Sequence, residues 1–411
     1  MQSRVTNLSE SDVQVEVFDD AFLVGGVRTP FGKFGGQLRE WSVVDLGVKA
    51  LIGLIDRLGL EEQAINELFV GMAMLEGGEF VPARQIAIAA GLRDGLPSLT
   101  IDRACCSGLT AAAFASRSSQ LHRGGGAVAL GVESMSQVPR LLRNSRWESR
   151  RGSLAVEDPL LMHSPVVGKP IAVYTGEEAL KWGVTREDQD EWALRSHERY
   201  FRAAERGYFD DEVLQLESGS ELIERDESPR SDTSYEKLSN LRCVYGSPTI
   251  TAGNAPETTD GAAAVFITSG SHSEQEGAEP LARIHSYLQV AGPPASGVAL
   301  PGLALERLVE HAGLNPSDLD VIEINEAFAA TAVVSAKVLA GRGGESAEEA
   351  IREVMNPNGG AVAIGHPTGA SGARLLLTAA RQLEAVNGRW AAVGICGGFG
   401  QTDAMLLERM A

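Results

Sequence analysis

Two adjacent cysteines stand at the start of an alanine-rich helix in this sequence, in the stretch "DRACCSGLTAAAFAS". The first, Cys105, precedes the Ser107-Gly108 pair by two positions, where a loop enters the helix. The unpaired N–H groups and the dipole of a helix N-terminus stabilise thiolate over thiol, so this position suits a nucleophile. A cysteine is nevertheless more often a small buried hydrophobic residue, and Cys105 alone leaves both interpretations open. The sequence indicates no role for Cys106.

The second half of the chain supplies groups that a sulfur nucleophile can use. The segment "NPNGGAVAIGHPTGASGAR" places His366 in a Gly-His-Pro turn ahead of a second Ser-Gly pair. In "GICGGFGQ", Cys396 is followed by glycines such as Gly398, whose N–H groups could hold an oxyanion. In "EINEAFAA", Asn325 ends a strand, where its amide could donate to a charge or a water, or could cap a helix.

The elements that must position these groups occur twice. "LIDRLGLEEQAINELFVG" resembles "LVEHAGLNPSDLDVIEIN", and "SGLTAAAFASRSSQLHRGGGAVALGVE" aligns without a gap with "SGARLLLTAARQLEAVNGRWAAVGIC". Each half therefore reads as helix, strand, loop, Ser-Gly, helix and buried strand, an alternation that predicts mixed sheets covered by helices. Two helix starts related by the repeat can then meet at one cleft, one carrying a thiol and the other an imidazole.

The length of 411 residues fits two core-bearing units. We expect an N-terminal half over residues 1–269 and a C-terminal half over residues 270–411. The stretch from about Pro139 to Tyr245 is richer in charged residues than the rest of both halves. We expect it to be an inserted loop domain over residues 139–245 of the first half.

Composition limits the partners and the compartment. The formal charge of −19 disfavours nucleic acid and anionic membranes, so a polyanionic ligand needs a local basic patch. Four cysteines without a C-x-x-C pair predict neither a disulfide framework nor a metal site. The acidic first residues do not read as a targeting segment, and no apolar run approaches the roughly 18 residues of a membrane span. We expect a soluble protein of the cytoplasm.

Seven segments in order resemble the thiolase family, and the likeness covers nearly the whole chain. They are "VRTPFGKFGG", the C-x-S-G of residues 105–108, "GVESMSQVP", "TAGNAPETTDGAAA", "NEAF", "NPNGGAVAIGHPTGASGAR" and the last cysteine with its glycines. The resemblance implies an α/β thiolase-like fold, in which two duplicated βα halves form a layered αβαβα core with an inserted loop domain. It also implies a homodimer or homotetramer.

Thiolases exchange an acyl group between coenzyme A thioesters by making or breaking the carbon–carbon bond next to the thioester carbonyl. The resemblance implies that Cys105 attacks the 3-oxo carbon and that His366 activates it. His366, with a water held by Asn325, would stabilise the enolate oxygen of acetyl-CoA, and Cys396 would move the α-proton. The amides of Cys105 and Gly398 would hold the tetrahedral intermediate. Coenzyme A enters as a substrate, and the resemblance implies no cofactor and no metal.

Some positions depart from the family pattern, and others bear on the phosphates of coenzyme A. Phe399 stands among the glycines after Cys396, and Pro256 replaces a serine that contacts the pantetheine arm in many relatives. Arg230 matches an arginine that binds the nucleotide end in some relatives. The run "RLLRNSRWESRRG" holds Arg140, Arg143, Arg146, Arg150 and Arg151. Such a run is more often a solvated or subunit-contact face, which makes Arg230 the better candidate.

Two alternative functions follow from the same residues. A decarboxylating ketoacyl synthase shares the fold and the position of the nucleophile, but it typically lacks a catalytic counterpart of Cys396. An acyl-CoA or lipid-binding relative without catalysis would have lost at least one of Cys105, Asn325, His366 and Cys396, and this chain retains all four. The acyl chain and the degradative or biosynthetic direction stay open at the level of sequence.

Overall fold

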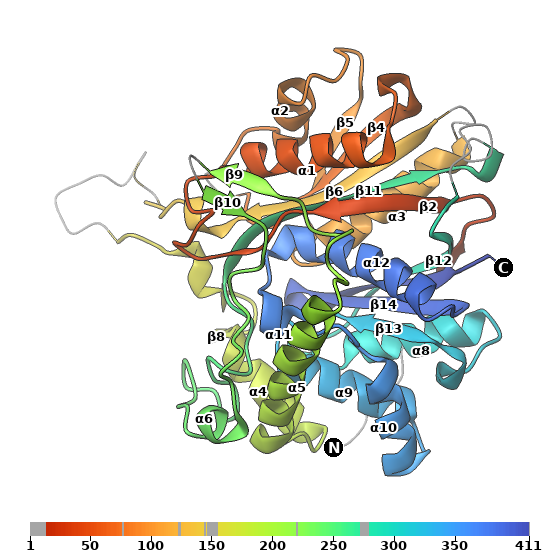
Figure 1. Ribbon diagram of the computed structural model, residues 1–411. Helices are drawn as coiled ribbons and strands as arrows, with labels where there is room; N and C mark the ends of the chain where they lie inside the picture. Colours follow the sequence, from red (N-terminus) through yellow and green to blue (C-terminus); the bar gives the residue numbers. More distant parts are fainter. Residues whose placement is uncertain are drawn as a thin grey trace.

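The structure is a computed structural model that describes residues 14–75, 78–121, 125–143, 145, 155–218, 221–271 and 279–410. Within these ranges, strands and helices alternate along both halves of the chain. Each half contributes a sheet, and the two sheets stack with a shared helical layer between them (Figure 1).

The first sheet contains strands of the N-terminal half. In spatial order they are β2 (Phe22–Arg28), β11 (Thr259–Thr268), β6 (Gly126–Ser134), β4 (Ile65–Gly71) and β5 (Ser98–Ile101). The order from β2 to β6 is antiparallel and that from β6 to β5 is parallel. Its helices are α1 (Val43–Leu58) and α2 (Pro82–Ala89) on the outer face and α3 (Ser107–Leu121) on the inner face (Figure 1). Because helices cover both faces, β6 and β11 are buried along their whole length.

The second sheet repeats this arrangement with the C-terminal half. Its strands in spatial order are β12 (Ala282–Ala291), β15 (Gln401–Glu408), β14 (Trp390–Gly397) and β13 (Val321–Ile324). Its helices are α8 (Leu300–His311) and α9 (Ala329–Ala340) outside, α12 (Thr368–Ala385) inside, and α10 (Gly344–Val354) and the short α11 (Ala361–Ile364) before α12.

The five layers follow one another as helix, sheet, helix, sheet and helix (Figure 1). A short pairing of β12 with β2, at Ala282 with Leu23 and Arg283 with Phe22, joins the two sheets. Two short strands extend them: β1 (Val15–Val17) pairs with β12, and β3 (Gly32–Lys33) pairs with β11. This architecture confirms the expected layered αβαβα core.

The central layer contains α3 and α12, the two helices that the repeat predicts to correspond. Their first turns approach so closely that glycine is required at the contact. A Cβ atom on Gly108 would lie 2.6 Å from the carbonyl oxygen of Gly369, and one on Gly372 would lie 2.2 Å from the backbone nitrogen of Leu109. Real Cβ atoms do not approach backbone this closely, so the glycine of each Ser-Gly pair brings the two helix starts together.

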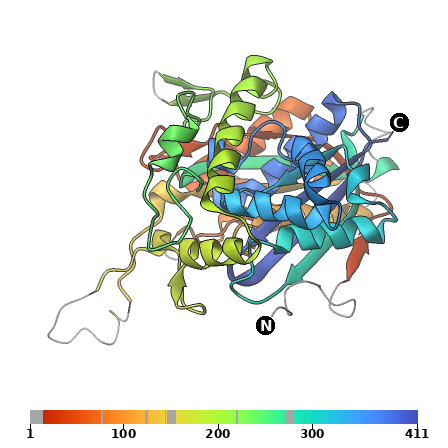
Figure 2. The ribbon, with the colours of Figure 1, turned by 90° about the horizontal axis from the view of Figure 1, so that it is seen from below.

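The stretch expected to be an inserted domain contains helices and two small hairpins. They are α4 (Ile171–Lys181), α5 (Arg186–Glu205), α6 (Tyr235–Ser239), β7 (His163–Ser164) with β8 (Lys169–Pro170), and β9 (Leu216–Ser218) with β10 (Glu221–Ile223). Both α4 and α5 pack against α9 of the second half. Backbone hydrogen bonds pair Leu141 with Glu157, and the chain around this pair projects from the body of the molecule (Figure 2).

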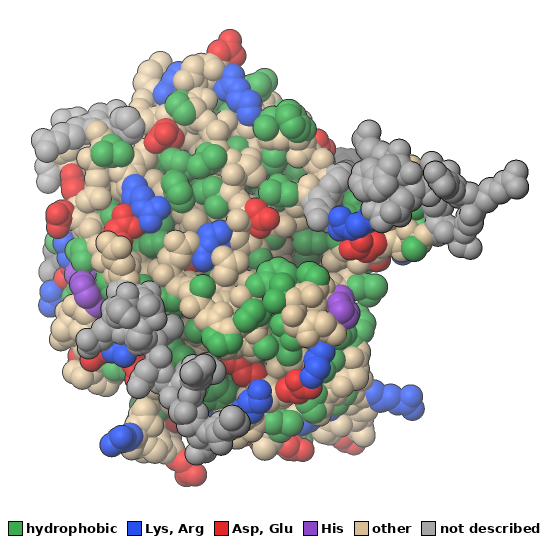
Figure 3. All heavy atoms as spheres, turned by 180° about the vertical axis from the view of Figure 1, so that it is seen from behind, with side chains coloured by type: hydrophobic (Ala, Val, Ile, Leu, Met, Phe, Trp, Pro, Cys, Tyr) green, Lys and Arg blue, Asp and Glu red, His purple; other side chains and the backbone are tan. Residues whose placement is uncertain are grey.

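The surface mixes both signs of charge. On the face opposite to that of Figure 1, acidic and basic side chains are interspersed, and no broad basic area is visible among the described residues (Figure 3). None of the helices in the described ranges combines the length and the apolar character that crossing a bilayer requires.

Candidate active site

A cavity of about 420 Å³ lies where the two halves meet, and three of the expected residues line it. Cys105 enters from the loop before α3, Cys396 from the end of β14, and Gly398 from the turn that follows β14. Thr368, the first residue of α12, and Tyr174 on α4 complete the walls nearest to these groups. Both sulfurs therefore border one space that can hold an acyl group.

The turn before α3 presents Cys105 to this cavity. Ala104 adopts a positive φ of 50°, and the Ser107 hydroxyl accepts from the Arg103 N–H at 2.8 Å while donating to the Ala104 carbonyl at 2.6 Å. The glycines after Cys396 lie directly against this turn. A Cβ on Gly397 would be 2.9 Å from the Arg103 carbonyl oxygen, and a Cβ on Gly398 would be 3.6 Å from the Ala104 Cβ.

Cys106 has a structural position rather than a place in the cavity. It is fully buried, and its sulfur lies 3.3 Å from the carbonyl oxygen of Ile395 on β14. A Cβ on Gly397 would be 3.0 Å from the same sulfur. The second cysteine thus fills the narrow contact between the start of α3 and the strand that carries Cys396.

His366 and Asn325 form a buried pair, and neither of them lines this cavity. The Asn325 Nδ2 lies 3.3 Å from the His366 Nε2, and the His366 Nδ1 lies 2.6 Å from the Ser371 hydroxyl. An amide nitrogen can only donate, so Nε2 accepts and Nδ1 carries the ring proton. Ser371 accepts that proton and donates its own to the Pro367 carbonyl at 3.1 Å. The ring is therefore held as a neutral imidazole whose Nε2 lone pair can take up a proton.

Asn325 does not cap a helix, which decides one of the alternatives left by the sequence. Helix α9 begins only at Ala329, with Phe328 at the N-cap position. The Oδ1 of Asn325 is buried and has no protein partner among the described residues. Buried polar atoms are normally hydrogen-bonded, so this acceptor is suited to a water or a substrate group. The neighbouring Glu326 instead accepts from Trp192, Ser196, Asn356 and Val362, and so ties α5 to the loop ahead of α11.

Glu133 is a residue of the site that the sequence reasoning missed. It is fully buried at the end of β6 and accepts from the backbone of Ala73 and Met74, from the Thr368 hydroxyl at 2.6 Å and from the Gly369 N–H at 2.9 Å. It therefore fixes the start of α12 against the wall of the cavity. Its position in the family-like segment "GVESMSQVP" was the available signal, but nothing in the segment indicates which contacts it makes.

Burial governs the pKa values of the three reactive groups. Burial raises the pKa of the Cys105 thiol, and the nearby Cys396 and Glu133 raise it further. Burial, and then the charge of Glu178, raises the pKa of Cys396 to about 12. Burial and the Arg374 cation lower the pKa of His366 to about 3. Burial of Cys105 therefore opposes the thiolate that the start of a helix favours.

Arg230 lies away from the cavity that holds the two sulfurs. Its side chain is more than half exposed, pairs with Glu257 at 2.7 Å and borders a separate cavity of about 140 Å³ together with His197 and Lys237. Glu257 links Arg230 to the histidine turn. Its side chain pairs with Arg230, and its carbonyl accepts from the His366 N–H at 3.2 Å.

The expected arginine run is only partly described. Arg140 is exposed and lies 3.7 Å from Asp158, whereas Arg143 borders the active-site cavity and pairs with Glu157. Arg146, Arg150 and Arg151 lie outside the described residues.

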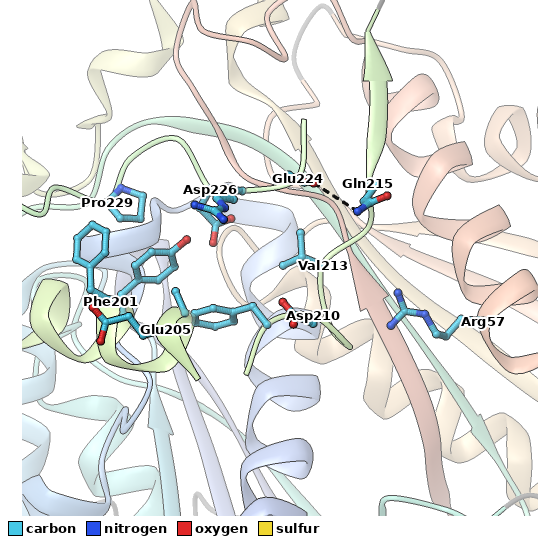
Figure 4. Close-up of a pocket in the computed structure, with 13 residues that line it drawn as sticks. Arg57, Phe201, Glu205, Asp210, Val213, Gln215, Glu224, Asp226 and Pro229 are labelled. Atoms are coloured by element: carbon cyan, nitrogen blue, oxygen red, sulfur yellow. Dashed lines mark hydrogen bonds between the residues drawn. The ribbon is translucent and has the colours of Figure 1, made fainter. Parts of the chain in front are cut away.

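A larger cavity, of about 830 Å³, lies elsewhere, between α5, Arg57 and residues 209–229 (Figure 4). The side chains that Figure 4 labels there include Phe201, Asp210 and Asp226, and none of the expected catalytic residues lines this cavity. No cluster of three or more potential metal ligands occurs within the described ranges.

Comparison with known proteins gives matches along both halves of the chain. The family profiles "Thiolase, N-terminal domain" and "Thiolase, C-terminal domain" match residues 21–271 and 278–409. The chain belongs to the thiolase family. This membership and the layered architecture confirm the predicted thiolase fold, and they make the chain an acyltransferase enzyme, as the sequence predicts.

Individual relatives of this thiolase extend over almost its whole length. A probable acetyl-CoA acetyltransferase of Mycobacterium leprae is 36% identical over 94% of this chain and 98% of its own. A beta-ketoadipyl-CoA thiolase of Pseudomonas aeruginosa is 37% identical over 95% of this chain and 99% of its own. The crystal structure of human mitochondrial 3-ketoacyl-CoA thiolase in complex with CoA superposes with a TM-score of 0.89, at 31% identity, and covers 95% of this thiolase and 98% of that chain.

Proposed function

We propose that this thiolase cleaves 3-oxoacyl-CoA with coenzyme A into acetyl-CoA and a shortened acyl-CoA, or runs the reverse Claisen condensation, through an acyl group on Cys105. The observation that carries the proposal is the shared cavity that Cys105, Cys396 and Gly398 all line. The relatives named for acetyl-CoA acetyltransferase and 3-ketoacyl-CoA thiolase activity support the same reaction.

The first half-reaction transfers the acyl group to the enzyme. The neutral His366 ring accepts the thiol proton of Cys105, which the raised thiol pKa otherwise retains at neutral pH. The sulfur attacks the 3-oxo carbon, and the bond between C2 and C3 breaks to leave the acetyl-CoA enolate. Cys396 gives its proton to C2, and its high pKa makes the resting group a thiol that can donate.

The second half-reaction releases the acyl group. The thiol of coenzyme A gives its proton to the Cys396 thiolate left by the first half-reaction, and its sulfur attacks the acyl carbon on Cys105. The tetrahedral intermediate collapses with Cys105 as the leaving group, and Cys105 takes back its proton from His366. We assign the oxyanion of this intermediate to the N–H groups of Cys105 and Gly398, and the contact between the turns that carry them supports the assignment. His366, with a water held by Asn325, would stabilise the enolate oxygen, and the unpaired Oδ1 of Asn325 supports that role.

Coenzyme A carries phosphates that need cations in this acidic protein. We propose that Arg230 contributes to the nucleotide end, since it is exposed and lies one contact from the histidine turn. Binding of a phosphate there must displace or share the Glu257 carboxylate that now pairs with Arg230. The reaction requires no further cofactor and no metal.

The proposal includes a homodimer or homotetramer that works in the cytoplasm. The resemblance to the family supports the assembly, which light scattering of the purified protein measures. All four cysteines are free thiols in the structure, which fits a reducing compartment.

Two substitutions separate the roles of the sulfurs. Purified protein is expected to consume acetoacetyl-CoA or a longer 3-oxoacyl-CoA only when coenzyme A is present. Cys105→Ala should abolish turnover, whereas Cys396→Ala should still acquire an acyl group but should not exchange the α-protons of acetyl-CoA. Cys106→Ala, which changes a neighbouring buried sulfur outside the cavity, serves as the matched control and should keep both reactions.

Mass spectrometry of the acylated enzyme and proton NMR of acetyl-CoA in deuterated water measure the two steps. Wild-type turnover in Cys105→Ala contradicts the assignment of the nucleophile. Equal loss of 3-oxoacyl-CoA without coenzyme A would instead indicate hydrolysis or decarboxylation, the latter being the reaction of a ketoacyl synthase. A panel of substrates of increasing chain length then defines the acyl group.

A further inference from the structure

Glu178 is a buried carboxylic acid beside the active site that no step of the proposed reaction uses. It is 6% exposed, on α4. Tyr174, one helical turn earlier on the same helix, lines the cavity that contains Cys105 and Cys396. Glu178 therefore lies on a helix that borders the active site, but its own side chain does not line the cavity.

The Glu178 side chain holds the beginning of α8. Its two oxygens accept from the backbone N–H groups of Val298 at 3.1 Å and Ala299 at 3.4 Å, immediately before the helix starts. Ala299 occupies the N-cap position of α8 and has no side-chain acceptor of its own. Glu178 thus supplies, from another helix, the acceptor that a helix N-terminus requires.

The loop that Glu178 holds also supports the glycine turn after Cys396. At the other end of this loop, the Gly292 N–H donates to the Gly400 carbonyl at 2.7 Å, and a Cβ on Gly400 would lie 2.4 Å from the Pro293 carbonyl oxygen. Helix α8 itself packs on β14, where a Cβ on Gly394 would lie 3.4 Å from Leu305. Residues 292–299 and α8 therefore back the segment of chain that presents Cys396 and Gly398.

We propose that Glu178 is a positioning residue for the acid–base step: it fixes the loop and helix behind Cys396, and its carboxylate sets the electrostatic environment of the Cys396 sulfur. The assignment of that sulfur to proton transfer rests on the proposed function. The contacts of Glu178 do not depend on the proposed function, so the two can be tested separately.

The titration of Glu178 gives the proposal a measurable signature. Burial raises its pKa to about 7, so the group gains its charge near neutral pH. The charged or titratable groups that interact with it are Lys181 and Tyr174 on its own helix and Cys396 on β14. Residues 292–299 carry none, and the charged residue of α9, which packs against α4, is Lys337, whose Nζ donates to the Gly183 carbonyl at 3.0 Å. A negative charge disfavours a nearby thiolate, so Cys396 is harder to deprotonate above pH 7 than below it.

Alkylation of Cys396 by iodoacetamide, followed by mass spectrometry of its peptide, reports the thiolate fraction without requiring turnover. In the wild type, the logarithm of the rate should rise with pH but with a shallower stretch around pH 7, where Glu178 ionises. In Glu178→Gln the rise should be straight, and at pH 8 the rate should exceed that of the wild type by up to about tenfold, which corresponds to one unit of pKa. Glu177→Gln, whose carboxylate pairs with Lys169 at 2.7 Å on the solvent side of α4, is the matched control and should follow the wild type.

Coincident profiles for Glu178→Gln and the wild type overturn the proposal. If Glu178→Gln does not fold, as circular dichroism would show, the wild-type profile alone decides, because a uniform slope through pH 7 is incompatible with a coupled carboxylate. A protein that shows the shallow stretch but no thiolysis refutes the proposed function and leaves the link between Glu178 and Cys396 in place. A protein that catalyses thiolysis but lacks the shallow stretch refutes the link between Glu178 and Cys396 and leaves the proposed function in place.

Discussion

At the scale of single residues, burial determines the resting chemistry of the site. The two thiols of the cavity have raised pKa values and His366 has a lowered one, so at neutral pH all three groups are uncharged. A thiol and a neutral imidazole are the correct starting partners for a proton transfer that accompanies attack on a carbonyl. Charge then develops only during the reaction, where backbone amides and Asn325 are already in place.

The lowered pKa of His366 predicts a dependence of stability on pH. The folded ring stays neutral down to about pH 3, whereas the unfolded ring, with an ordinary pKa of about 6.5, takes up a proton below that value. The unfolded state therefore binds more protons, and the free energy of unfolding falls as the pH drops from about 6.5 towards 3. At pH 5 this one residue accounts for a loss of about 2 kcal/mol relative to neutral pH.

Urea titrations of the wild type and of His366→Gln at pH 7 and pH 5 measure this effect. The variant should lose about 2 kcal/mol less stability between the two pH values than the wild type does. Parallel losses in both proteins would show that the ring is already protonated in the folded state.

The sequence predicted most of the reactive side chains at this scale but not the groups that hold them. Cys105, His366 and Cys396 stand in short motifs whose thiol and imidazole groups indicate a catalytic role. Glu133 and Glu178 act through hydrogen bonds to backbone N–H groups of segments far away in the chain, and such contacts exist only after folding. The raised pKa of Cys105 was missed for the same reason, since desolvation depends on everything packed around the sulfur.

At the scale of elements, the contact between α3 and α12 positions the site. The first turns of the two helices touch through Gly108 and Gly372, and each helix start is adjacent to a reactive side chain. The separation of the Cys105 loop from the His366 turn is therefore set by backbone contact, which side-chain motion cannot relax.

Gly372→Ala tests this contact. The new Cβ would lie 2.2 Å from the Leu109 nitrogen and 2.9 Å from the Gly108 carbonyl carbon, so the helices must separate. We expect a loss of about 1–3 kcal/mol in the free energy of unfolding, together with a larger loss of turnover than the remaining folded fraction explains. Denaturant titration and steady-state assays on one preparation measure both quantities.

Gly95→Ala is the matched control, because a Cβ there meets nothing within 4 Å. It should leave both stability and turnover close to the wild type. Wild-type turnover in Gly372→Ala would show that the two helix starts can move apart without disturbing the chemistry.

The internal repeat predicted these elements well, because strands and helices follow local patterns that recur in both halves. It could not predict that Asn325 ends a strand without capping α9, since the helix begins four residues later. Which residue caps a helix depends on where the backbone enters it. At the start of α9 this point is fixed by hydrogen bonds from distant segments, such as that of the Ala329 N–H to the Asn254 carbonyl.

At the scale of the whole molecule, buried ion pairs fasten the segments to one another. Arg28 on β2 is fully buried and pairs with Glu212 at 2.5 Å and with Asp226 at 2.6 Å, two acids that follow α5 in the chain. Burial alone lowers the pKa of Arg28, but the charges of Asp226 and Glu212 outweigh it, so the pKa is raised.

Arg28→Met leaves both acids buried without their cation. Removal of one partner from a buried pair typically costs about 3–5 kcal/mol, and we expect a loss of this size in the free energy of unfolding. Arg389→Met is the control, since that arginine is largely exposed in its pair with Glu408 and should cost less than about 1 kcal/mol. Equal losses in the two variants, measured by denaturant titration, would contradict the structural role of Arg28.

The join between the sheets is narrow, and the two helices between them come from different halves. A polypeptide with only one half would cover the inner face of its sheet with a single helix, and the side of that helix that now packs on its counterpart would face water. It would also hold only part of the reactive set, so the site exists only once both halves have folded against each other.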